Sequence, residues 1–575
     1  MLANWLLRFT PRLAQSAMGQ GEAPHIMSAS EFDFLVIGAG SSGAAVAARL
    51  GEDAGSTTCV LEAGGPDSHP FIHIPSFVAA AIGHEETNWR FATVPQAGMA
   101  GREIPVPRGR VIGGSGAING MVYFRGHPTD YDDWADMGCA GWSYREVLPY
   151  FTRNEHNEDY EASVFHGKTG PINVKHVENP NALNHAFMDA LGSLQFPHCP
   201  DFNGPDPEGY GRRQGLIRDG RRESTATSML KPAMARGNVH VQTDARVARI
   251  VVEDGRATGV ELVDGRVIRA RREVVLSAGT VQSPHILMLS GIGPGAHLRE
   301  HGIDVVHDLA GVGGNYQDHV ASPMHVETDD TTSYGISWKV LPRDLFYGLQ
   351  YLLSRKGPLA GNVFESVAFL RTDPSLDKPD VQFVFQPAKR LTNPKIPFPL
   401  GHGYAISPVA LYPKSRGTVR LGSADPAANP VIDPHLLEHP DDIQPLIRAL
   451  KIAREAFASQ PFARYDGTEV APGPEVGSDE ALDAYIRETG YTVHHPVGTC
   501  RMGDPAGAQT VVDPELRVKG IEGLRVADAS VMPSVIGGNT NAPCVMIAER
   551  CADFILGKPP MEPAQLPPTS VARYK

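Results

Sequence analysis

The stretch Phe32-Asp-Phe-Leu-Val-Ile-Gly-Ala-Gly-Ser-Ser-Gly43 decides the fold of this chain. It contains a short apolar run from Phe34 to Ile37, followed at once by glycines in the spacing G-x-G-x-x-G. Residues 44–50 are mostly small and apolar, which is typical of a helix, and residues 59–62 predict the next strand. This order predicts a βαβ unit, in which a right-handed crossover joins neighbouring strands of a parallel sheet.

The three glycines of this loop have separate expected tasks. Gly38 allows the tight turn, Gly40 lets a pyrophosphate approach the backbone, and Gly43 lets the helix pack closely on the strand. The N-terminus of the helix then faces the anion. Glu62 ends the next strand, where a carboxylate can accept hydrogen bonds from ribose hydroxyls. The sequence therefore predicts a nucleotide with free ribose hydroxyls, which leaves both NAD and FAD open.

A second glycine-rich run, Gly109-Arg-Val-Ile-Gly-Gly-Ser-Gly-Ala-Ile-Asn119, favours the longer of these ligands. NAD needs only one phosphate loop. A second loop made of Gly113, Gly114 and Ser115, with Asn119 as a polar anchor, indicates a more extended buried ligand. The alternative is a turn that serves only tight packing.

The rest of the chain predicts two interleaved domains. Apolar strands at 274–278 and 523–528 extend the nucleotide-binding sheet, so this domain is assembled from separated pieces of chain. Between the pieces, strand-like segments with alternating or mixed apolar character predict an antiparallel sheet with one face covered. These segments are 380–386, 404–412 and 417–422. Amphipathic helices are predicted at 441–459 and 478–488, and a proline-rich loop at 393–399 is expected to border the substrate entrance.

Composition excludes several classes of protein. The chain has 575 residues and a formal net charge of −13, which disfavours nucleic acid as a partner because phosphate binding needs a basic surface. No apolar run is long enough to span a bilayer. The six cysteines form no Cys-x-x-Cys pair, which favours reduced thiols, a cytoplasmic location and no metal site. Residues 1–21 carry Arg8 and Arg12 and are either a flexible extension, a targeting peptide or a membrane-surface helix.

The run Tyr491-Thr-Val-His-His-Pro-Val-Gly-Thr-Cys-Arg-Met-Gly503 places a histidine pair far downstream of the nucleotide loop. An imidazole with an unperturbed pKa near 6.5 can accept a proton at neutral pH. His495 is the candidate proton acceptor, and Pro496 restricts the backbone beside it. His494 is expected to point elsewhere in an extended segment and to form a wall of the pocket.

These motifs together resemble the glucose–methanol–choline (GMC) family of flavin oxidoreductases. Gly109–Asn119, with Tyr123 and Gly126 downstream, resembles the first family pattern, and Gly279–Gly293 resembles the second. The His-His-Pro-Val-Gly-Thr run and Gly537-Gly-Asn-Thr-Asn-Ala-Pro543 resemble the C-terminal catalytic region of the family. The motifs occur in the family's order, and the resemblance extends from Phe32 to Gly557.

The resemblance implies an α/β plus α+β fold: a Rossmann-like FAD-binding domain with an inserted substrate domain built on an antiparallel sheet with helices. It assigns 32–171, 215–317 and 491–557 to the FAD domain and 172–214 and 318–490 to the substrate domain. Residues 1–31 and 558–575 remain as an N-terminal extension and a C-terminal tail. The ADP half of FAD would lie on Gly38, Gly40, Gly43 and Glu62.

The remaining cofactor residues are also carried over from the family. Gly114 and Asn119 would lie along the flavin, the backbone of Val247 would meet the adenine, and Asp528 would lie near the ribityl chain. Some members bind their flavin covalently through a histidine near the second glycine-rich run. That run has no histidine here, so we expect noncovalent FAD.

The implied activity is oxidation of an alcohol. His495 would take the proton while the hydride passes to flavin N5, and Asn539 would orient the substrate oxygen. The helix expected over 541–556 would direct its N-terminus at flavin N1 and the C2 carbonyl. Flavin-containing hydroxynitrile lyases and fatty-acid photodecarboxylases share this fold and remain alternatives.

The sequence also narrows the substrate. Choline-handling members use a glutamate shortly after a Gln-Asp-His run, and here Ala321 follows Gln317-Asp318-His319 at that position. A buried cation without a counter-charge is costly, so we expect a neutral primary alcohol, aliphatic or aromatic. Oxygen or a quinone or another acceptor would take the electrons. The sequence predicts no oligomeric state.

Overall fold

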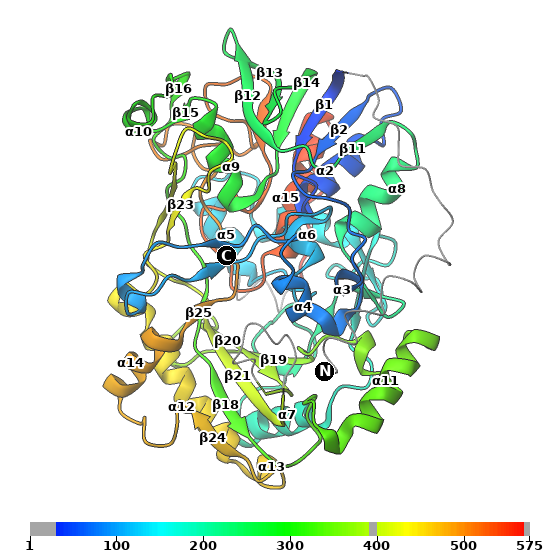
Figure 1. Ribbon diagram of the computed structural model, residues 1–575, viewed down its shortest axis with the longest axis vertical. Coiled ribbons are helices and arrows are strands. Elements are labelled where there is room, and N and C mark those ends of the chain that lie inside the picture. The colour runs from blue at the N-terminus through cyan, green and yellow to red at the C-terminus, as the bar shows by residue number, and fades with distance from the viewer. Residues whose placement is uncertain (1–29, 390–399, 568–575) are drawn as a thin grey trace.

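The computed structural model describes residues 30–389 and 400–567. The segment 1–21 and the proline-rich loop at 393–399 lie outside these residues. Two large sheets organise the chain, a seven-stranded sheet in the upper half of Figure 1 and an eight-stranded sheet in the lower half. The expected α/β and α+β architecture is confirmed.

The predicted βαβ unit forms the centre of the upper sheet. It consists of β1 (Glu31–Ile37), α2 (Ser41–Leu50) and β2 (Thr58–Leu61), with β1 and β2 parallel. On its other side β1 pairs in parallel with β14 (Val267–Leu276), which in turn pairs in parallel with β26 (Leu524–Val526). The parallel core of the sheet is therefore built from segments far apart in the sequence, as predicted.

Two further parts complete this sheet. The strand β11 (Val239–Gln242) pairs in parallel with β2 at one edge. At the other edge, β12 (Val247–Glu253) and β13 (Arg256–Leu262) form an antiparallel meander with the start of β14.

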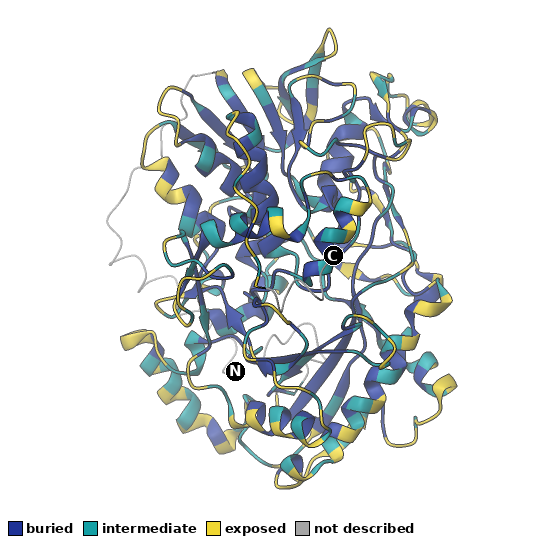
Figure 2. Cartoon of the chain, turned by 180° about the vertical axis from the view of Figure 1, so that it is seen from behind, coloured by how far each residue is buried: buried dark blue, intermediate teal, exposed yellow. Residues whose placement is uncertain are grey.

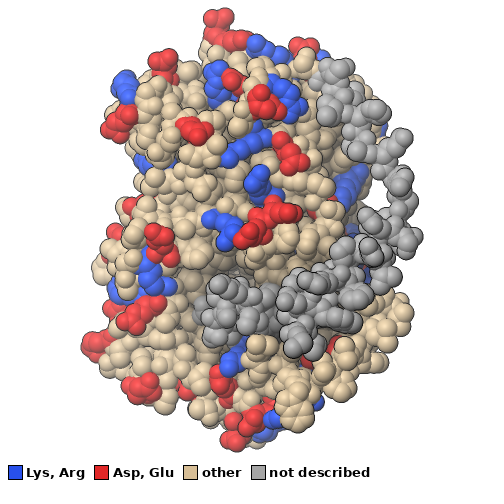
Figure 3. Space-filling model, viewed as in Figure 1, with Lys and Arg blue, Asp and Glu red and all other residues tan. Residues whose placement is uncertain are grey.

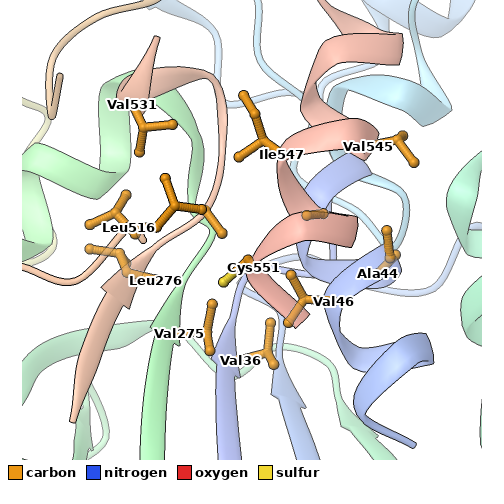
Figure 4. Close-up of a cluster of buried hydrophobic side chains, with 14 of the residues drawn as sticks. Val36, Ala44, Val46, Val275, Leu276, Leu516, Val531, Val545, Ile547 and Cys551 are labelled. Carbon is orange, nitrogen blue, oxygen red and sulfur yellow. The ribbon is translucent and has the colours of Figure 1, made fainter. Parts of the chain in front are cut away.

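A buried apolar cluster joins the sheet to the helix α15 (Asn541–Ile555), which packs beside α2. Figure 4 shows Val46 of α2 and Cys551 of α15 next to Val36 and Val275 of the sheet. All four side chains are inaccessible to solvent. Burial of a side chain such as valine contributes about 1.5–3 kcal/mol. This packing fixes where α15 begins, which matters because its first turn lies at the functional site.

The lower sheet is antiparallel. Its central strands β20 (Val381–Gln386) and β21 (Gly403–Ala410) pair along their whole length. Its other strands are β24 (Thr468–Ala471), β18 (Met324–Glu327), β19 (Ser366–Leu370), β7 (Gly209–Arg212), β17 (Val320–Ala321) and β25 (Tyr491–Thr492). The helices α7 (Ala182–Ser193) and α12 (Gln444–Ala458) pack on the central strands.

Two expectations about this sheet are wrong. Every residue of β21 is buried, so the sheet is covered on both faces rather than one. Residues 417–422 do not join it. They contain β22 (Thr418–Arg420), which pairs only with β23 (Val431–Asp433). Hydrogen bonds between Gly417 and Tyr316 hold this segment away from the large sheet.

The predicted helices are confirmed with small shifts. The helix expected at 441–459 is α12, preceded by the short 3₁₀ turn η7 (Pro440–Asp442). The helix expected at 478–488 is α14 (Asp479–Thr489), capped by the hydroxyl of Ser478. The proposed domain boundaries stay a prediction. Figure 2 shows both sheets buried, with exposed positions concentrated on peripheral helices and turns.

Candidate active site

A cavity of about 420 Å³ extends from the first glycine loop to the histidine pair. One wall comes from the upper sheet and its loops, and the other from the inner face of the lower sheet. Ser407 and Val409 of β21 and Gln382 and Val384 of β20 line it, which explains why the second face of that sheet is buried. The cavity brings together most of the predicted site residues. These are Gly38, Gly40, Glu62, Gly114, Asn119, Val247, Asp528, His495 and Asn539.

Gly43 is the one predicted residue that does not line the cavity, and its place is set by packing. A Cβ added at Gly43 would lie 1.9 Å from the carbonyl oxygen of Gly38, so no side chain fits there. Gly38 itself has a φ of +96°, a conformation that favours glycine.

The two glycine-rich runs form a single cradle. A Cβ on Gly114 would lie 2.7 Å from Cα of Gly40, and Gly114 has a φ of +53°. The backbone N–H of Gly113 donates to the carbonyl of Ala39 at 2.8 Å. Because the runs meet backbone to backbone, peptide groups rather than side chains face the cavity at this point. Such a surface suits a pyrophosphate and a long planar ligand, so the residues present fit FAD.

Two buried carboxylates brace this cradle. Glu62 accepts hydrogen bonds at 2.9 Å from the backbone N–H groups of Ala39 and Gly64. Asp528 accepts from the N–H of Gly279 at 2.8 Å and from Oγ of Ser283 at 2.6 Å. Burial raises the pKa of both groups, that of Glu62 to about 7. Both carboxylates also line the cavity, where their remaining lone pairs can accept from hydroxyl groups.

Asn119 and Val247 lie at other points of the same cavity. Oδ1 of Asn119 accepts from the N–H of Met121 and from Nη1 of Arg222, each at 2.9 Å. Val247 is the first residue of β12 and contributes to the wall near the nucleotide-binding strands.

His495 is held on three sides. Its backbone N–H donates to Oδ1 of Asp318 at 2.7 Å. Its ring nitrogen Nδ1 lies 3.0 Å from Nδ1 of His319, and Nε2 lies 2.8 Å from Nδ2 of Asn539. The side chain is buried but lines the cavity.

The partners of His319 determine which nitrogen of His495 carries the proton. Nε2 of His319 lies 2.9 Å from the carbonyl oxygen of Leu411, which can only accept, so Nε2 of His319 is the donor. Burial lowers the pKa of His319 to about 4, so the ring is neutral and its Nδ1 is an acceptor. The N–H of His495 must therefore be on Nδ1. Its Nε2 lone pair is left facing Asn539 and the cavity.

The environment of His495 lowers its pKa well below the ordinary value. Burial is the largest cause, followed by His319, His494 and Arg108. The ordinary imidazole value near 6.5 therefore does not apply to His495. The consequence is a ring that is neutral throughout the neutral pH range, so Nε2 keeps its lone pair, which accepts an N–H from Asn539 in this structure.

Asn539 lies directly before the first turn of α15. Its Oδ1 accepts from Nε2 of Gln382 at 3.4 Å, which turns the Nδ2 donor toward His495. Asn541 begins α15, and its Nδ2 donates to Oγ of Ser41 at 2.7 Å. The helix expected over 541–556 is confirmed, and its N-terminus lies at the cavity, where Thr540 and Asn541 are lining residues.

His494 lines the cavity, but its backbone differs from the expectation. The segment is not extended at this residue, which has a φ of +67°. Nη2 of Arg108 donates to the carbonyl of His494 at 2.7 Å and holds this turn in place. A left-handed non-glycine residue is strained, and such strain concentrates at functional sites. Burial lowers the pKa of His494 to about 3.

Sequence reasoning missed the side chains that position His495. Oδ1 of Asp318 accepts from the backbone N–H groups of both His319 and His495, so it ties the two segments together. The Gln317-Asp318-His319 run contains two of these residues, but in the sequence it was used only to locate Ala321. Arg108 and Gln382 were missed because nothing in their local sequence points to the histidine pair.

Comparisons with known proteins identify the family of this chain. The family model for the N-terminal part of GMC oxidoreductases matches residues 32–321, and the C-terminal model matches residues 413–548. The chain belongs to the GMC oxidoreductase family. It is an FAD-dependent alcohol oxidoreductase, and its predicted fold and membership are confirmed.

Named relatives cover nearly the whole chain. It is 44% identical to the oxygen-dependent choline dehydrogenase of Rhizobium johnstonii, over 92% of this chain and 96% of that protein. Among solved structures, pyridoxine 4-oxidase from Mesorbium loti is 32% identical with a TM-score of 0.80, covering 91% of this chain and 98% of that one. Formate oxidase from Aspergillus oryzae is 26% identical with a TM-score of 0.84, covering 92% and 99%.

Proposed function

We propose that this protein oxidises a neutral primary alcohol, aliphatic or aromatic, to the aldehyde, with Nε2 of His495 accepting the hydroxyl proton. The hydrogen-bond chain from Leu411 through His319 carries this proposal, because it leaves that lone pair facing the cavity. Nδ2 of Asn539 donates one N–H to this lone pair at 2.8 Å, a contact that the substrate hydroxyl would replace, and its second N–H can donate to the substrate oxygen and orient the hydroxyl toward His495.

FAD bound without a covalent link is the second part of the proposal. When bound, FAD supplies the acceptor for the hydride that leaves the carbinol carbon. Gly38, Gly40 and Glu62 would hold the ADP half, and Gly43 would let α2 pack closely enough for its N-terminus to face that half. Gly114, Asn119, Val247 and Asp528 would hold the remainder. The second glycine-rich run offers no histidine for a covalent bond.

The charge of the cavity disfavours a cationic substrate, although close relatives are named choline dehydrogenases. Ala321 pairs across the sheet with Val409 and Tyr491, which both line the cavity, so its Cβ is on the same face as theirs. That position carries no carboxylate. The charged residues that line the cavity at this end include Arg108 and Arg213, and a positive charge on either would repel a quaternary ammonium.

An anaerobic substrate panel tests the proposal. Benzylic and medium-chain alcohols should bleach the yellow holoenzyme faster than choline does. Admission of air then shows whether oxygen or another acceptor, such as a quinone, reoxidises it. Failure of every alcohol to bleach the protein would favour the lyase or photodecarboxylase alternatives.

The substrate part of the proposal has its own pair of variants. Ala321→Glu should raise the specificity constant for choline relative to a benzylic alcohol, and Ala321→Gln, of similar volume but neutral, should not. The proposal of a neutral substrate would be wrong if the parent protein preferred choline over all neutral alcohols. Acid precipitation should release the FAD into the supernatant, and yellow colour in the pellet would contradict noncovalent binding.

A further inference from the structure

One helix leaves most of its apolar side chains in solvent. This is α11 (Leu341–Ser354), on the lower right edge of the molecule in Figure 1. Leu345, Leu349 and Leu352 follow a helical spacing along one face and are 66%, 55% and 81% exposed. Phe346 and Leu353 flank this row and are also exposed, and the 83% exposed Trp338 precedes the helix. We call these six side chains the α11 face.

Such a face requires a partner. Scattered exposed apolar residues are normal, but a contiguous group of large ones marks an interaction site. The opposite side of the helix is anchored to the protein, because Tyr351 is buried and its hydroxyl donates to the carbonyl of Gly220 at 3.1 Å. The face therefore remains presented outward on a fixed support.

Charges at the ends of the helix identify the partner. Lys339 precedes the helix, and the exposed Arg355 and Lys356 follow it. Lys339 is paired with Asp329 at 3.4 Å, and none of the six side chains of the α11 face is acidic. Large apolar side chains that include tryptophan, bordered by basic residues, are typical of helices lying in the interface of a bilayer with anionic lipids. Each basic residue near such a surface contributes about 1 kcal/mol to binding.

A second copy of the chain fits this face less well. A stable dimer buries about 800 Å² on each partner, with an apolar centre inside a polar rim. Here the apolar side chains lie along a single helix at the periphery, and Figure 3 shows the visible surface there as largely uncharged, with charged side chains only at its margins. Within residues 30–389 and 400–567, no helix is long and apolar enough to cross a membrane. The expected contact is therefore with the surface of the bilayer.

The helix is also close to the cavity. It packs against the 3₁₀ turn η6 (Pro358–Ala360), which contacts the turn η1 (Pro75–Phe77). The next element, α4 (Val78–Gly83), contributes Val78 and Ile82 to the cavity wall. We propose that the α11 face docks this enzyme onto an anionic lipid bilayer and brings the cavity next to the membrane, where apolar alcohols concentrate.

The test is flotation of the FAD-loaded full chain with vesicles. Parent protein should float with vesicles of phosphatidylethanolamine and phosphatidylglycerol, and less with phosphatidylcholine alone. The variant Leu345→Glu/Leu349→Glu/Leu352→Glu should bind the anionic vesicles at least about tenfold more weakly. Lys339→Glu/Arg355→Glu/Lys356→Glu should lose the preference for anionic lipid. A matched control, Val263→Glu/Val267→Glu/Val306→Glu, alters exposed valines of the upper half and should float like the parent.

Each variant is first checked for FAD content and for alcohol-dependent bleaching in solution, which shows that it has folded. Equal flotation of parent and leucine variant would overturn the proposal and assign vesicle binding to another part, such as residues 1–21. Absence of parent flotation would also overturn it. If sedimentation velocity without lipid showed a parental dimer and a monomeric leucine variant, the partner would be a second copy instead.

Discussion

The two ends of the cavity are built by different means. At the cofactor end, peptide groups of two glycine-rich runs face the ligand space, and Gly40 touches Gly114 closely enough to exclude a Cβ. At the catalytic end, the surface is made of side chains from distant segments, with His319 and His495 in contact across 176 positions of sequence. The cofactor end depends on the absence of side chains at its glycines. The catalytic end depends on how its side chains are positioned.

This difference predicts different consequences of mutation. A backbone cradle fails when any atom is added to it, and its failure removes the cofactor. Loss of one side chain at the catalytic end lowers the activity only in part, because each member contributes orientation or a proton site while the cofactor stays bound.

The largest effect is expected at the contact between the glycine-rich runs. Gly114→Ala places a Cβ 2.7 Å from Cα of Gly40 and forces alanine into a φ of +53°, so the two loops must separate. We expect loss of most bound FAD, measured as the ratio of flavin to protein absorbance after purification. Gly65→Ala is the control, because an added Cβ there meets nothing within 4 Å. Full flavin content in Gly114→Ala would contradict the cradle.

The next largest effect is expected at the proton acceptor. His495→Ala should keep its FAD but lose alcohol-dependent flavin reduction by at least about 10²-fold, the scale of a removed general base. Asn539→Ala should lose less, because it removes only orientation of the substrate oxygen. His494→Ala should lose least. Stopped-flow reduction under anaerobic conditions gives the three rates, and a near-parental rate in His495→Ala with none in His494→Ala would exchange their roles.

The same contrast explains what the sequence could predict. The first loop was recognisable because a tight turn and a close approach need glycines at neighbouring positions, so Gly38, Gly40 and Gly43 form a local pattern. The role of His319 could not be recognised in the sequence, because it depends on contacts with Leu411 and His495 that arise only from folding. The depressed pKa of His495 was missed for the same reason, since burial is a property of the assembled cavity.

Strand segments show this limit as well. Residues 417–422 alternate in the manner of a strand in the large sheet, and they do form a strand. Its partner is β23, and the adjoining Gly417 bonds to Tyr316, not to the large sheet. A period-two pattern predicts the conformation of a strand but not the sheet that it joins.

A smaller effect is expected at His319, which positions His495 without reaching the cavity lining. His319→Asn puts a shorter amide in place of a ring that bridges the carbonyl of Leu411 and the Nδ1–H of His495, so His495 loses its fixed support. We expect reduction about tenfold slower, with KM little changed. The pKa of His495 should rise, since His319 is among the groups that lower it. The readouts are the split between kcat and KM and the pH profile. His198→Asn, on a loop remote from the cavity, serves as control. An unchanged pH profile would leave His319 with only a structural role.

The smallest effect is expected from moderate acid on the parent protein. A free histidine would be half protonated near pH 6.5, and a base with that pKa would lose activity as the pH falls through it. Burial depresses the pKa of His495 well below this value, so the neutral, proton-accepting form persists to lower pH. The second-order rate constant for flavin reduction should therefore change less than about twofold between about pH 8 and about pH 6. Measurement by stopped flow in buffers of constant ionic strength, with flavin content checked at each pH, decides the point. A fall in this rate constant centred near pH 6.5 would mean that His495 titrates as an exposed imidazole does. The catalytic end of the cavity would then be far more open to water than the cofactor end.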